Sequence, residues 1–337
     1  MMNVTVVILG DGLASTALGP LEVFFAAGVL FQTLKGEAPS QLFEVTTASI
    51  DGKSVSAAYG LGLTPQKSID DIERTDIIIV PTSGTEVDLK LIENSALLPW
   101  LRKHHALGAY IAGTCMGSVY LAEAGLLDGR EATTHWASAD DFARRYPKVK
   151  WRPECFVTED ARLLCSGGVT SAIDVSLYLV EKLVGHDIAV QTAKALLHPM
   201  PRLNQSGYAV LPFSPPHEDA AIREVEMFIQ EHFRENLSVE ALAEKFGMSG
   251  RTFLRRFKAA TGRLPGAYVQ AVRVEMAKAM LERERASVQA IAAHVGYDDV
   301  SFFRTLFKRA TGMTPGDYRN HFGKFSIRKT EAPDHTT

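Results

Sequence analysis

Residues 4 to 196 alternate short apolar runs with longer segments in which apolar residues recur at helical spacing. The apolar runs are rich in β-branched residues and predict strands at 4–9, 42–47, 76–81 and 108–112, with shorter strands near 132–134 and at 162–165. The segments between them predict helices over 18–34, 88–103, 118–124 and 172–184. Almost uniformly apolar strands separated by helices are typical of a parallel sheet covered on both faces. We therefore expect a doubly wound α/β domain with its ligand site at the carboxyl ends of the strands.

This alternation ends near residue 198. The next 18 residues contain five prolines, at positions 199, 201, 212, 215 and 216. Asn, Gln, Ser and Gly lie among them. Such a composition favours a linker between domains. A helical pattern over 220–233 then opens a second domain.

The second domain contains one pattern twice. Residues 257–268 and 307–318 share Phe, Lys, Ala, Thr, Gly, Pro, Gly and Tyr at an offset of 50, and residues 241–247 match 290–296 at an offset of 49. Ser238 begins the first copy as a helix N-cap, and Gly247 suits the left-handed residue that closes its short helix. Ser287 and Gly296 take the same places in the second copy. A short helix, a turn and a second helix, present twice, predict two helix-turn-helix units in an all-α domain.

The second helix of each copy, over 249–260 and 299–310, has an apolar side and a basic side. Phe253, Phe257, Phe303 and Phe307 lie on the apolar sides. The basic sides carry Arg251, Arg255, Arg256 and Lys258 in the first helix, and Ser301, Arg304, Thr305, Lys308 and Arg309 in the second. One such helix could be a solvated surface, but two of them favour helices that enter the major groove of DNA.

The distribution of charge supports the same partner. Residues 237–330 hold 17 Lys and Arg against 8 Asp and Glu, a net charge of +9, so that the total of -3 leaves -12 on the rest of the chain. An asymmetry this large indicates a polyanion that binds one domain only.

The repeated segment resembles the DNA-binding domain of AraC/XylS-type transcriptional regulators, in which a long helix, here 264–283, joins the two units. The stretch from Gly296 to Arg319 matches the signature of that family. Carried over by position, the resemblance implies double-stranded DNA as a partner. It also implies base-reading side chains at Arg251, Leu254 and Arg255 in the first unit and at Val300, Ser301, Arg304 and Thr305 in the second.

Composition excludes several other classes of protein. No run of 18 apolar residues exists, and the first residues lack the basic-then-apolar pattern of a secretory signal, so we expect a cytoplasmic protein. Three cysteines at irregular spacing argue against a disulfide framework and against a zinc site. We expect neither a metal nor a cofactor.

The clearest chemical motif is Ala112-Gly113-Thr114-Cys115-Met116-Gly117-Ser118, between a predicted strand and a predicted helix. A nucleophile on a sharp strand-to-helix turn needs small neighbours, and Gly113 and Gly117 supply them. The helix N-terminus behind Cys115 should lower the pKa of its thiol. Gly84 could offer a backbone N–H as in an oxyanion hole, and His135 is a candidate base. In the alternative interpretation, Cys115 is a small apolar core residue and His135 a histidine at a strand end.

With its flanking glycines, this motif resembles that of the ThiJ/PfpI group of class I glutamine-amidotransferase-like, flavodoxin-like folds, over about residues 3–198. Further matches are 19–24, 132–136 and 166–174. Enzymes of that group pair the cysteine with an acid after the first strand, where this chain has Thr16. The resemblance therefore implies a fold that no longer catalyses and instead binds a small metabolite, such as the nitrogenous compounds to which relatives with this domain pairing respond. The candidate pocket residues are Thr16, Gly84, Cys115, His135, Thr170 and Asp174, although Asp174 could instead brace its helix.

The leading hypothesis is a ligand-responsive transcription factor that dimerises through its first domain. The alternative is a Cys115-dependent hydrolase or hydratase tethered to a DNA-binding domain, and a third possibility is redox sensing through Cys115. The predicted organisation is a sensor domain over 1–198, a linker over 199–218, a DNA-binding domain over 219–323 and a tail over 324–337.

Overall fold

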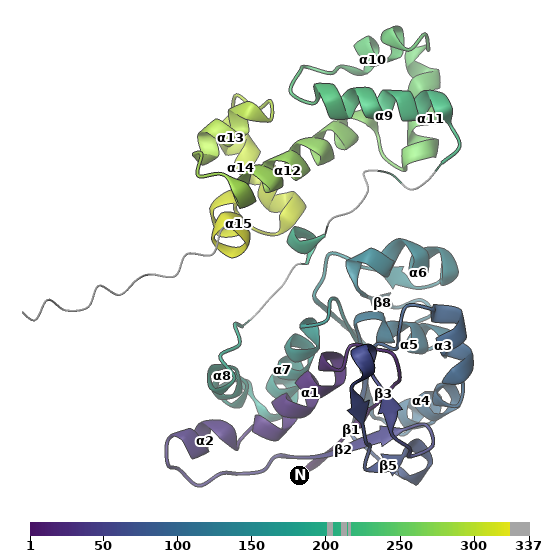
Figure 1. Cartoon of the computed structure of the whole chain (residues 1–337), viewed down its shortest axis with the longest axis vertical. Helices are drawn as coiled ribbons and strands as arrows, with labels where there is room; N and C mark the ends of the chain where they lie inside the picture. Colours follow the sequence, from purple (N-terminus) through teal and green to yellow (C-terminus); the bar gives the residue numbers. More distant parts are fainter. Residues whose placement is uncertain (201–204, 210–213, 215–216, 324–337) are drawn as a thin grey trace, which may run out of the picture. The chain divides into compact units, whose positions relative to one another are not determined.

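The computed structural model describes residues 1–200, 205–209, 214 and 217–323. The chain divides into two compact units, an N-terminal unit of residues 1–209 and a C-terminal unit of residues 210–337 (Figure 1). This division falls within the predicted linker. The predicted tail, 324–337, lies outside the described residues.

A seven-stranded sheet with the order β10-β11-β7-β6-β1-β2-β5 forms the centre of the N-terminal unit. Every neighbouring pair in it is parallel except β10 and β11. Its strands are β1 (Met2–Val7), β2 (Phe43–Ser49), β5 (Lys67–Ser68), β6 (Ile77–Val80), β7 (Tyr110–Thr114), β10 (Val157–Asp160) and β11 (Leu163–Ser166). The predicted doubly wound, flavodoxin-like sheet is therefore confirmed.

Helices cover both faces of this sheet, since alternate residues of its strands point to opposite sides. Val6 and Ile79 pack in one core cluster with residues of α1 (Ser15–Ala26), α7 (Ser171–Val184) and α8 (His186–Ala195). Val7 and Ile78 pack in another with residues of α3 (Val87–Glu93), α4 (Leu97–Ala106), α5 (Ser118–Glu123) and α6 (Ala139–Arg145). Because both faces are buried, the central strands can be apolar along their whole length.

Two long predicted helices are each divided. The segment 18–34 forms α1 and α2 (Leu30–Leu34) because Gly28 takes a φ of +76°, where a Cβ would lie 2.3 Å from the carbonyl oxygen of Ser40. The segment 88–103 forms α3 and α4, and between them the side-chain amide of Asn94 donates to the carbonyl oxygen of Lys90 at 2.8 Å.

The strand expected near 132–134 does not belong to the main sheet. It is β8 (Glu131–Ala132), which pairs with β9 (Lys150–Trp151) in a separate two-stranded sheet. A second small sheet pairs β3 (Val55–Ser56) with β4 (Gly62–Leu63).

The C-terminal unit is helical and contains the repeat that the sequence predicts. Its helices are α9 (Ala220–His232), α10 (Val239–Lys245), α11 (Gly250–Thr261), α12 (Pro265–Arg283), α13 (Val288–His294), α14 (Val300–Thr311) and α15 (Pro315–Phe322). The hydroxyls of Ser238 and Ser287 cap α10 and α13, each accepting a backbone N–H at 3.1 Å. Gly247 and Gly296 have positive φ, as predicted for the residues that close these helices.

The two halves of the repeat share one core. Phe253 and Phe257 of α11 are fully buried, as are Phe303 and Phe307 of α14. Each half also ends in the same ring contact, since Phe257 and Phe307 meet Tyr268 and Tyr318 edge-on, with ring centroids 5.4 Å apart in both pairs. These contacts hold one side of α11 and one side of α14 against the core and leave the opposite sides exposed.

Arg273, in the middle of α12, joins the two halves. Its guanidinium donates to the carbonyl oxygens of Phe233, Glu235 and Gly296 at 2.7 to 2.9 Å. The first two acceptors lie between α9 and α10, and the third lies in the turn between α13 and α14. The same group lies over the ring of Tyr297, 5.0 Å from its centroid.

The described residues of the predicted linker are attached to one unit or the other. Gln205 is buried in the N-terminal unit, and Tyr208 meets the ring of Phe156 there. In the C-terminal unit, Ser214 and His217 both bond the carboxylate of Glu226 on α9.

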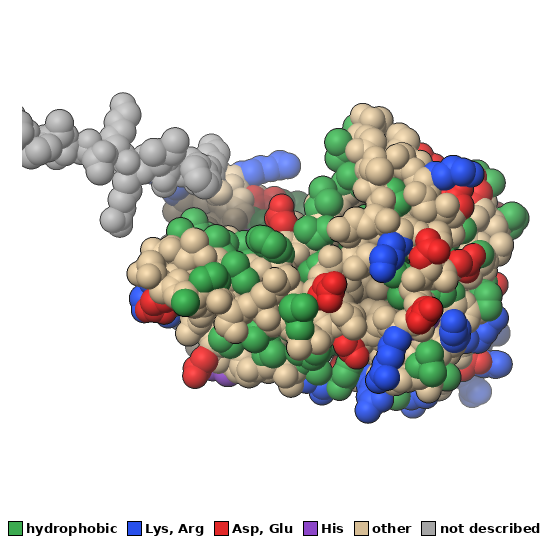
Figure 2. All heavy atoms as spheres, turned by 90° about the horizontal axis from the view of Figure 1, so that it is seen from below, with side chains coloured by type: hydrophobic (Ala, Val, Ile, Leu, Met, Phe, Trp, Pro, Cys, Tyr) green, Lys and Arg blue, Asp and Glu red, His purple; other side chains and the backbone are tan. Residues whose placement is uncertain are grey.

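No helix among the described residues is long and apolar enough to cross a membrane. The face drawn in Figure 2 shows hydrophobic side chains scattered among charged ones.

Candidate functional site

Cys115 stands directly after β7, on a sharp turn. Its φ is +56°, and a short 3-10 turn (Cys115–Gly117) leads from it into α5. A Cβ on Gly113 would lie 2.7 Å from the Cα of Ser118, and one on Gly117 would lie 2.3 Å from the carbonyl oxygen of Val80. Both positions therefore require glycine, which confirms the predicted need for small neighbours. A side chain held at positive φ at a strand end is typical of a functional position.

The environment of the Cys115 thiol stabilises its protonated form. The residue is 4% exposed, and burial raises its pKa to about 11, against the smaller opposing effect of a backbone hydrogen bond from Met116. The prediction of a lowered thiol pKa is thus wrong. A six-residue helix behind a 3-10 turn offers little dipole, and the loss of hydration on burial outweighs it.

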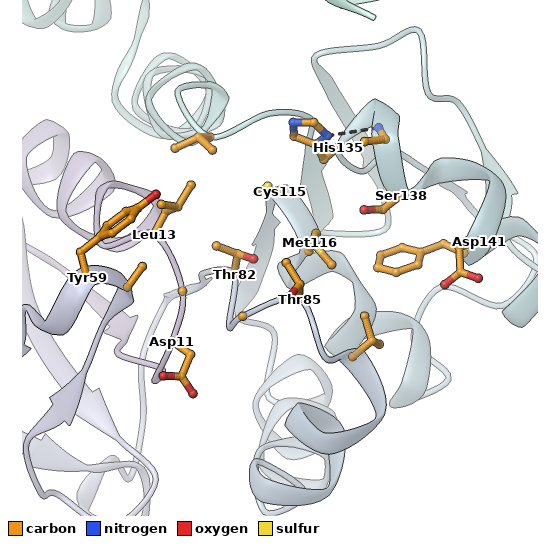
Figure 3. Close-up of a pocket in the computed structure, with 17 residues that line it drawn as sticks. Asp11, Leu13, Tyr59, Thr82, Thr85, Cys115, Met116, His135, Ser138 and Asp141 are labelled. Carbon is orange, nitrogen blue, oxygen red and sulfur yellow. Dashed lines mark hydrogen bonds between the residues drawn. The ribbon is translucent and has the colours of Figure 1, made fainter. Parts of the chain in front are cut away.

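A pocket of about 620 Å³ opens at the carboxyl ends of β1, β6 and β7 (Figure 3). Leu13 and Tyr59 lie on one side of it and His135, Ser138 and Asp141 on the other, with Cys115 and Thr82 between them. Gly84, Thr85, Met116 and Val169 also contribute to its wall. This is the edge of the sheet at which the sequence predicts a ligand site.

His135 is held as a neutral ring. Its Nδ1 accepts the backbone N–H of Ala137 at 3.1 Å, so the ring proton of the neutral form is assigned to Nε2. Burial lowers the pKa of the imidazole. In this tautomer, Nε2 can donate a hydrogen bond to a ligand but cannot accept a proton from the thiol.

The six predicted ligand residues fall into two groups. Gly84, Cys115 and His135 line the pocket, and Thr16, Thr170 and Asp174 are not among its lining residues. Thr16 is fully buried, and its hydroxyl is engaged within the protein. It donates to the carbonyl oxygen of Leu13 at 2.7 Å and accepts from the backbone N–H of Thr82 at 3.3 Å.

Asp174 has the bracing contact that was the alternative to ligand binding. Its Oδ1 lies 3.3 Å from Nε2 of His198, and both side chains are largely buried. This pair connects the first turn of α7 to the chain that follows α8. Thr170 immediately precedes α7 and forms its N-cap.

Three lining residues carry chemistry that the sequence analysis missed. Asp11 follows β1 and pairs with the ammonium of Lys90. Asp141 belongs to α6, and Tyr59 is 99% exposed at a φ of +62°. The Gly10-Asp11-Gly12 turn after the first strand was a signal for Asp11, whereas Tyr59 and Asp141 lie in segments without any motif.

The C-terminal unit presents its base-reading candidates on the exposed sides of α11 and α14. Arg251, Arg255 and Arg304 are exposed, and no hydrogen bond or ion pair to another described residue engages their guanidinium groups. Of the other predicted positions, Ser301 and Thr305 are exposed, whereas Leu254 and Val300 are half-buried. Three long cations are thus free to reach outward from two helices.

Arg256 differs from its neighbours on α11. Its guanidinium is bound to the carboxylate of Asp219, the N-cap of α9, and is therefore not free to meet DNA. In the sequence, Arg256 belongs to the basic side of the predicted helix 249–260, which contains no Asp or Glu. The acid comes from another helix, which spacing along α11 could not reveal.

Two family models match this chain. The helix-turn-helix domain model covers residues 242–321, and the DJ-1/PfpI family model covers residues 21–182. The chain therefore combines an AraC-type helix-turn-helix domain with a DJ-1/PfpI domain. The two resemblances inferred from the sequence are thereby confirmed.

Relatives of this chain match across both units. The HTH-type transcriptional regulator CdhR of Pseudomonas aeruginosa is 28% identical over 83% of this chain and 82% of its own length. The HTH-type transcriptional regulator GlxA of Rhizobium meliloti is 27% identical over 84% and 86%. An isonitrile hydratase of Pseudomonas putida is 38% identical, but over only 40% of this chain and 57% of its own.

Solved structures show the same fold for the DJ-1/PfpI domain. An AraC family transcriptional regulator from Pseudomonas putida matches 58% of this chain and 100% of its own, with a TM-score of 0.50 and 24% identity. Drosophila melanogaster DJ-1beta matches 59% and 98%, with a TM-score of 0.50 and 20% identity.

Proposed function

We propose that this protein is a transcriptional regulator that binds a specific DNA sequence and is controlled by a small metabolite held in the pocket beside Cys115. The observation that carries the proposal is the presence in one chain of two exposed, unpaired arginine faces and of a separate pocket. Relatives that are named transcriptional regulators match over both units, which supports the same division of labour here.

The DNA-binding role rests on α11 and α14. Each presents arginine on the side opposite its buried phenylalanines, and an arginine can bond O6 and N7 of guanine together in the major groove. We infer that Leu254 and Val300, which are half-buried on the same helices, contact thymine methyl groups. The +9 charge of residues 237–330 adds attraction to the phosphate backbone.

The metabolite is a small nitrogenous compound. Among the described residues, the charged ones that line the pocket are two carboxylates, Asp11 and Asp141, with no Lys or Arg beside them in the lining. Tyr59 adds an aromatic face at the rim, and carboxylates with aromatic rings favour cationic nitrogen. The carboxylate of Asp11 pairs with the ammonium of Lys90. Asp141 pairs with Arg144 at the protein surface, where water weakens the ion pair, so its carboxylate is the more available one for a ligand.

The DJ-1/PfpI domain acts as a binding module and not as an enzyme. A thiol with a pKa of about 11 is almost entirely protonated at neutral pH, and the tautomer of His135 cannot take its proton. The similarity to an isonitrile hydratase covers 40% of the chain and supports the fold of this domain, whereas the regulators match across both units. Replacing Cys115 by Ser should therefore leave the response to the metabolite intact.

The protein acts in the cytoplasm as a homodimer formed by the N-terminal unit. Phe25 on α1 and Leu34 on α2 are 62% and 68% exposed, and we infer that they take part in the dimer interface.

The test of DNA recognition uses the full chain and an operator selected by it from random duplexes. Arg251→Ala and Arg304→Ala should each cost about 1–3 kcal/mol of binding free energy and relax the preference at one base position. Arg309→Ala removes the same charge from an exposed position of α14 that is not among the predicted base-reading ones, and it should keep the base preference. If both of the first two variants keep the affinity and the preference of the wild type, the proposal is wrong.

The test of the metabolite is a thermal-shift screen of amino acids and quaternary amines against the full chain. A compound that binds only the folded pocket, at 100 times its dissociation constant, adds about 2.7 kcal/mol of stability. Asp141→Asn should reduce the shift, and Asp128→Asn, a carboxylate away from the pocket lining, should not.

A further inference from the structure

Gln205 is the first described residue after the 201–204 gap, inside the segment that the sequence predicts as a linker. It is 1% exposed. Its side-chain Nε2 lies 2.9 Å from the carbonyl oxygen of Thr134, 3.0 Å from that of Cys155 and 3.2 Å from the hydroxyl of Thr133. Its backbone N–H donates to the carbonyl oxygen of Glu154 at 2.8 Å. Burying an amide without hydrogen-bond partners would cost free energy of folding. The three acceptors around the side chain of Gln205 therefore make it a specific attachment of the predicted linker segment to the N-terminal unit.

The protein also makes room for this side chain. A Cβ on Gly167 would lie 2.4 Å from Oε1 of Gln205 and 2.6 Å from its Nε2. Gly167 does not have positive φ, so its backbone conformation is compatible with alanine. Glycine is required here because a Cβ would occupy the space that the side chain of Gln205 fills.

The acceptors of Gln205 lead directly to the pocket. The hydroxyl of Thr134 donates to the carbonyl oxygen of Cys115 at 3.1 Å, and His135 is the next residue in the chain. Cys115 and His135 both line the pocket (Figure 3). A chain of two hydrogen bonds, from Gln205 to Thr134 and from Thr134 to Cys115, therefore joins the linker segment to both residues.

We propose that Gln205 is a positioning residue of the pocket: its amide fixes Thr134, and through it the orientation of His135 and Cys115, so that the state of the pocket is coupled to the hold on segment 205–209. Only residues 210–213 separate this segment from Ser214, whose hydroxyl bonds Glu226 of α9. A change at the pocket that loosens Gln205 thus releases the chain leading to the DNA-binding unit. Coupling of this kind is reciprocal, so that loss of the Gln205 contact also loosens the pocket. The regulatory meaning rests on the proposed function, but the coupling itself does not.

Hydrogen–deuterium exchange of the full chain tests this coupling without a ligand. Gln205→Glu keeps the size of the side chain but removes the donor. The backbone N–H groups of Ala137 and Ser138, bonded to Nδ1 and the carbonyl oxygen of His135, should exchange about tenfold faster in this variant. The matched control is Gln41→Glu, an exposed glutamine whose amide also bonds a backbone carbonyl, and it should leave those two groups unchanged.

Gly167→Ala breaks the same contact from the opposite side. It should speed exchange at Ala137 and Ser138 as Gln205→Glu does, and it should add nothing in a chain that already carries Gln205→Ala, where no side-chain amide fills the space. A purely structural role for Gln205 would instead speed exchange in β1 and β6 to the same extent.

Thr134→Val tests the second hydrogen bond of the chain. It removes the hydroxyl that reaches Cys115 but keeps the carbonyl that Gln205 binds. In this background, Gln205→Glu should still loosen residues 135–138 but should no longer affect residues 115–118.

Wild-type exchange at residues 135–138 in both Gln205→Glu and Gly167→Ala would overturn the proposal, as would an equal acceleration across the sheet. Failure of the proposed function has a different signature. In that case the pocket segments respond as described, but operator binding by the full chain is the same in wild type and Gln205→Glu and changes with none of the screened compounds.

Discussion

The carboxylate of Asp219 binds the guanidinium of Arg256 at two points, with Nε donating to Oδ2 at 3.0 Å and Nη2 donating to Oδ1 at 2.6 Å. Arg255, the preceding residue on α11, is exposed and unpaired among the described residues. Two adjacent arginines of one helix thus have different tasks. Arg256 fastens the helix to the start of α9, and Arg255 is left for DNA.

Replacing each of these arginines by alanine should separate the two tasks. Arg256→Ala should lower the thermal unfolding midpoint, because it removes a two-point ion pair between α9 and α11. Arg255→Ala should leave that midpoint unchanged but weaken operator binding by about 1–3 kcal/mol. Calorimetry and operator titration of both variants check this. Equal thermal shifts in the two would contradict the assignment.

The same pair should make stability depend on pH in acid. The hydrogen bond from Arg256 holds the pKa of Asp219 below its ordinary value of 3.8. The folded state therefore binds fewer protons than the unfolded state, and the contribution of Asp219 is present above that value and lost as pH falls below it. The difference in unfolding midpoint between wild type and Asp219→Asn should shrink below pH 4. A difference that stays constant down to pH 2 would exclude this cause.

The exposed lysines of the recognition helices should add affinity without sequence preference. Lys258→Ala and Lys308→Ala should weaken binding to all duplexes alike and reduce the slope of log K against log salt by about one each. Titrations at several salt concentrations, with operator and with random DNA, measure this slope. An unchanged slope would show that neither lysine meets a phosphate.

Alkylation of Cys115 should be slow at neutral pH. With a thiol pKa of about 11, the reactive thiolate fraction rises about tenfold per pH unit through the range from 7 to 10. The rate of carbamidomethylation at Cys115, followed by mass spectrometry in this range, should rise in proportion. A rate that levels off below pH 8 would reveal an activated thiolate and would revive the hydrolase alternative.

His104 on α4 should limit stability in mild acid. The ring is fully buried and tilted against Trp100, with 4.5 Å between ring centroids. Burial lowers its pKa from 6.5, so the unfolded state binds the proton first and stability falls as pH drops below 6.5. His104→Phe should flatten this dependence between pH 6.5 and 5. His186→Phe, at an exposed position, should not.

The sequence predicted those parts of the fold that local patterns determine. The apolar runs predicted where the central strands lie along the chain, and the repeat predicted both helix-turn-helix units, with Ser238 and Ser287 as caps. The sequence did not predict the helix breaks at Gly28 and Asn94, because these breaks depend on contacts with distant residues, Ser40 and Tyr120. An apolar helical period continues through such a break.

The pocket was predicted less completely than the fold. Cys115 and His135 were found because a glycine pattern and a strand end mark them. Tyr59 and Asp141 reach the pocket from loops and a helix that only the three-dimensional fold brings to the same edge of the sheet. The lowered thiol pKa was wrong for a related reason, because burial is a property of the folded surroundings and not of the motif.

The three carbonyl groups that Arg273 binds belong to both halves of the DNA-binding unit. Helix α12 therefore not only separates the two helix-turn-helix units but also joins them. It follows that the halves are not interchangeable modules. A chimaera that exchanges 288–322 with a relative should keep its operator affinity only when its α12 matches the incoming half. Operator repertoires in this family are then expected to diversify through surface residues of α11 and α14 more readily than through shuffling of whole halves.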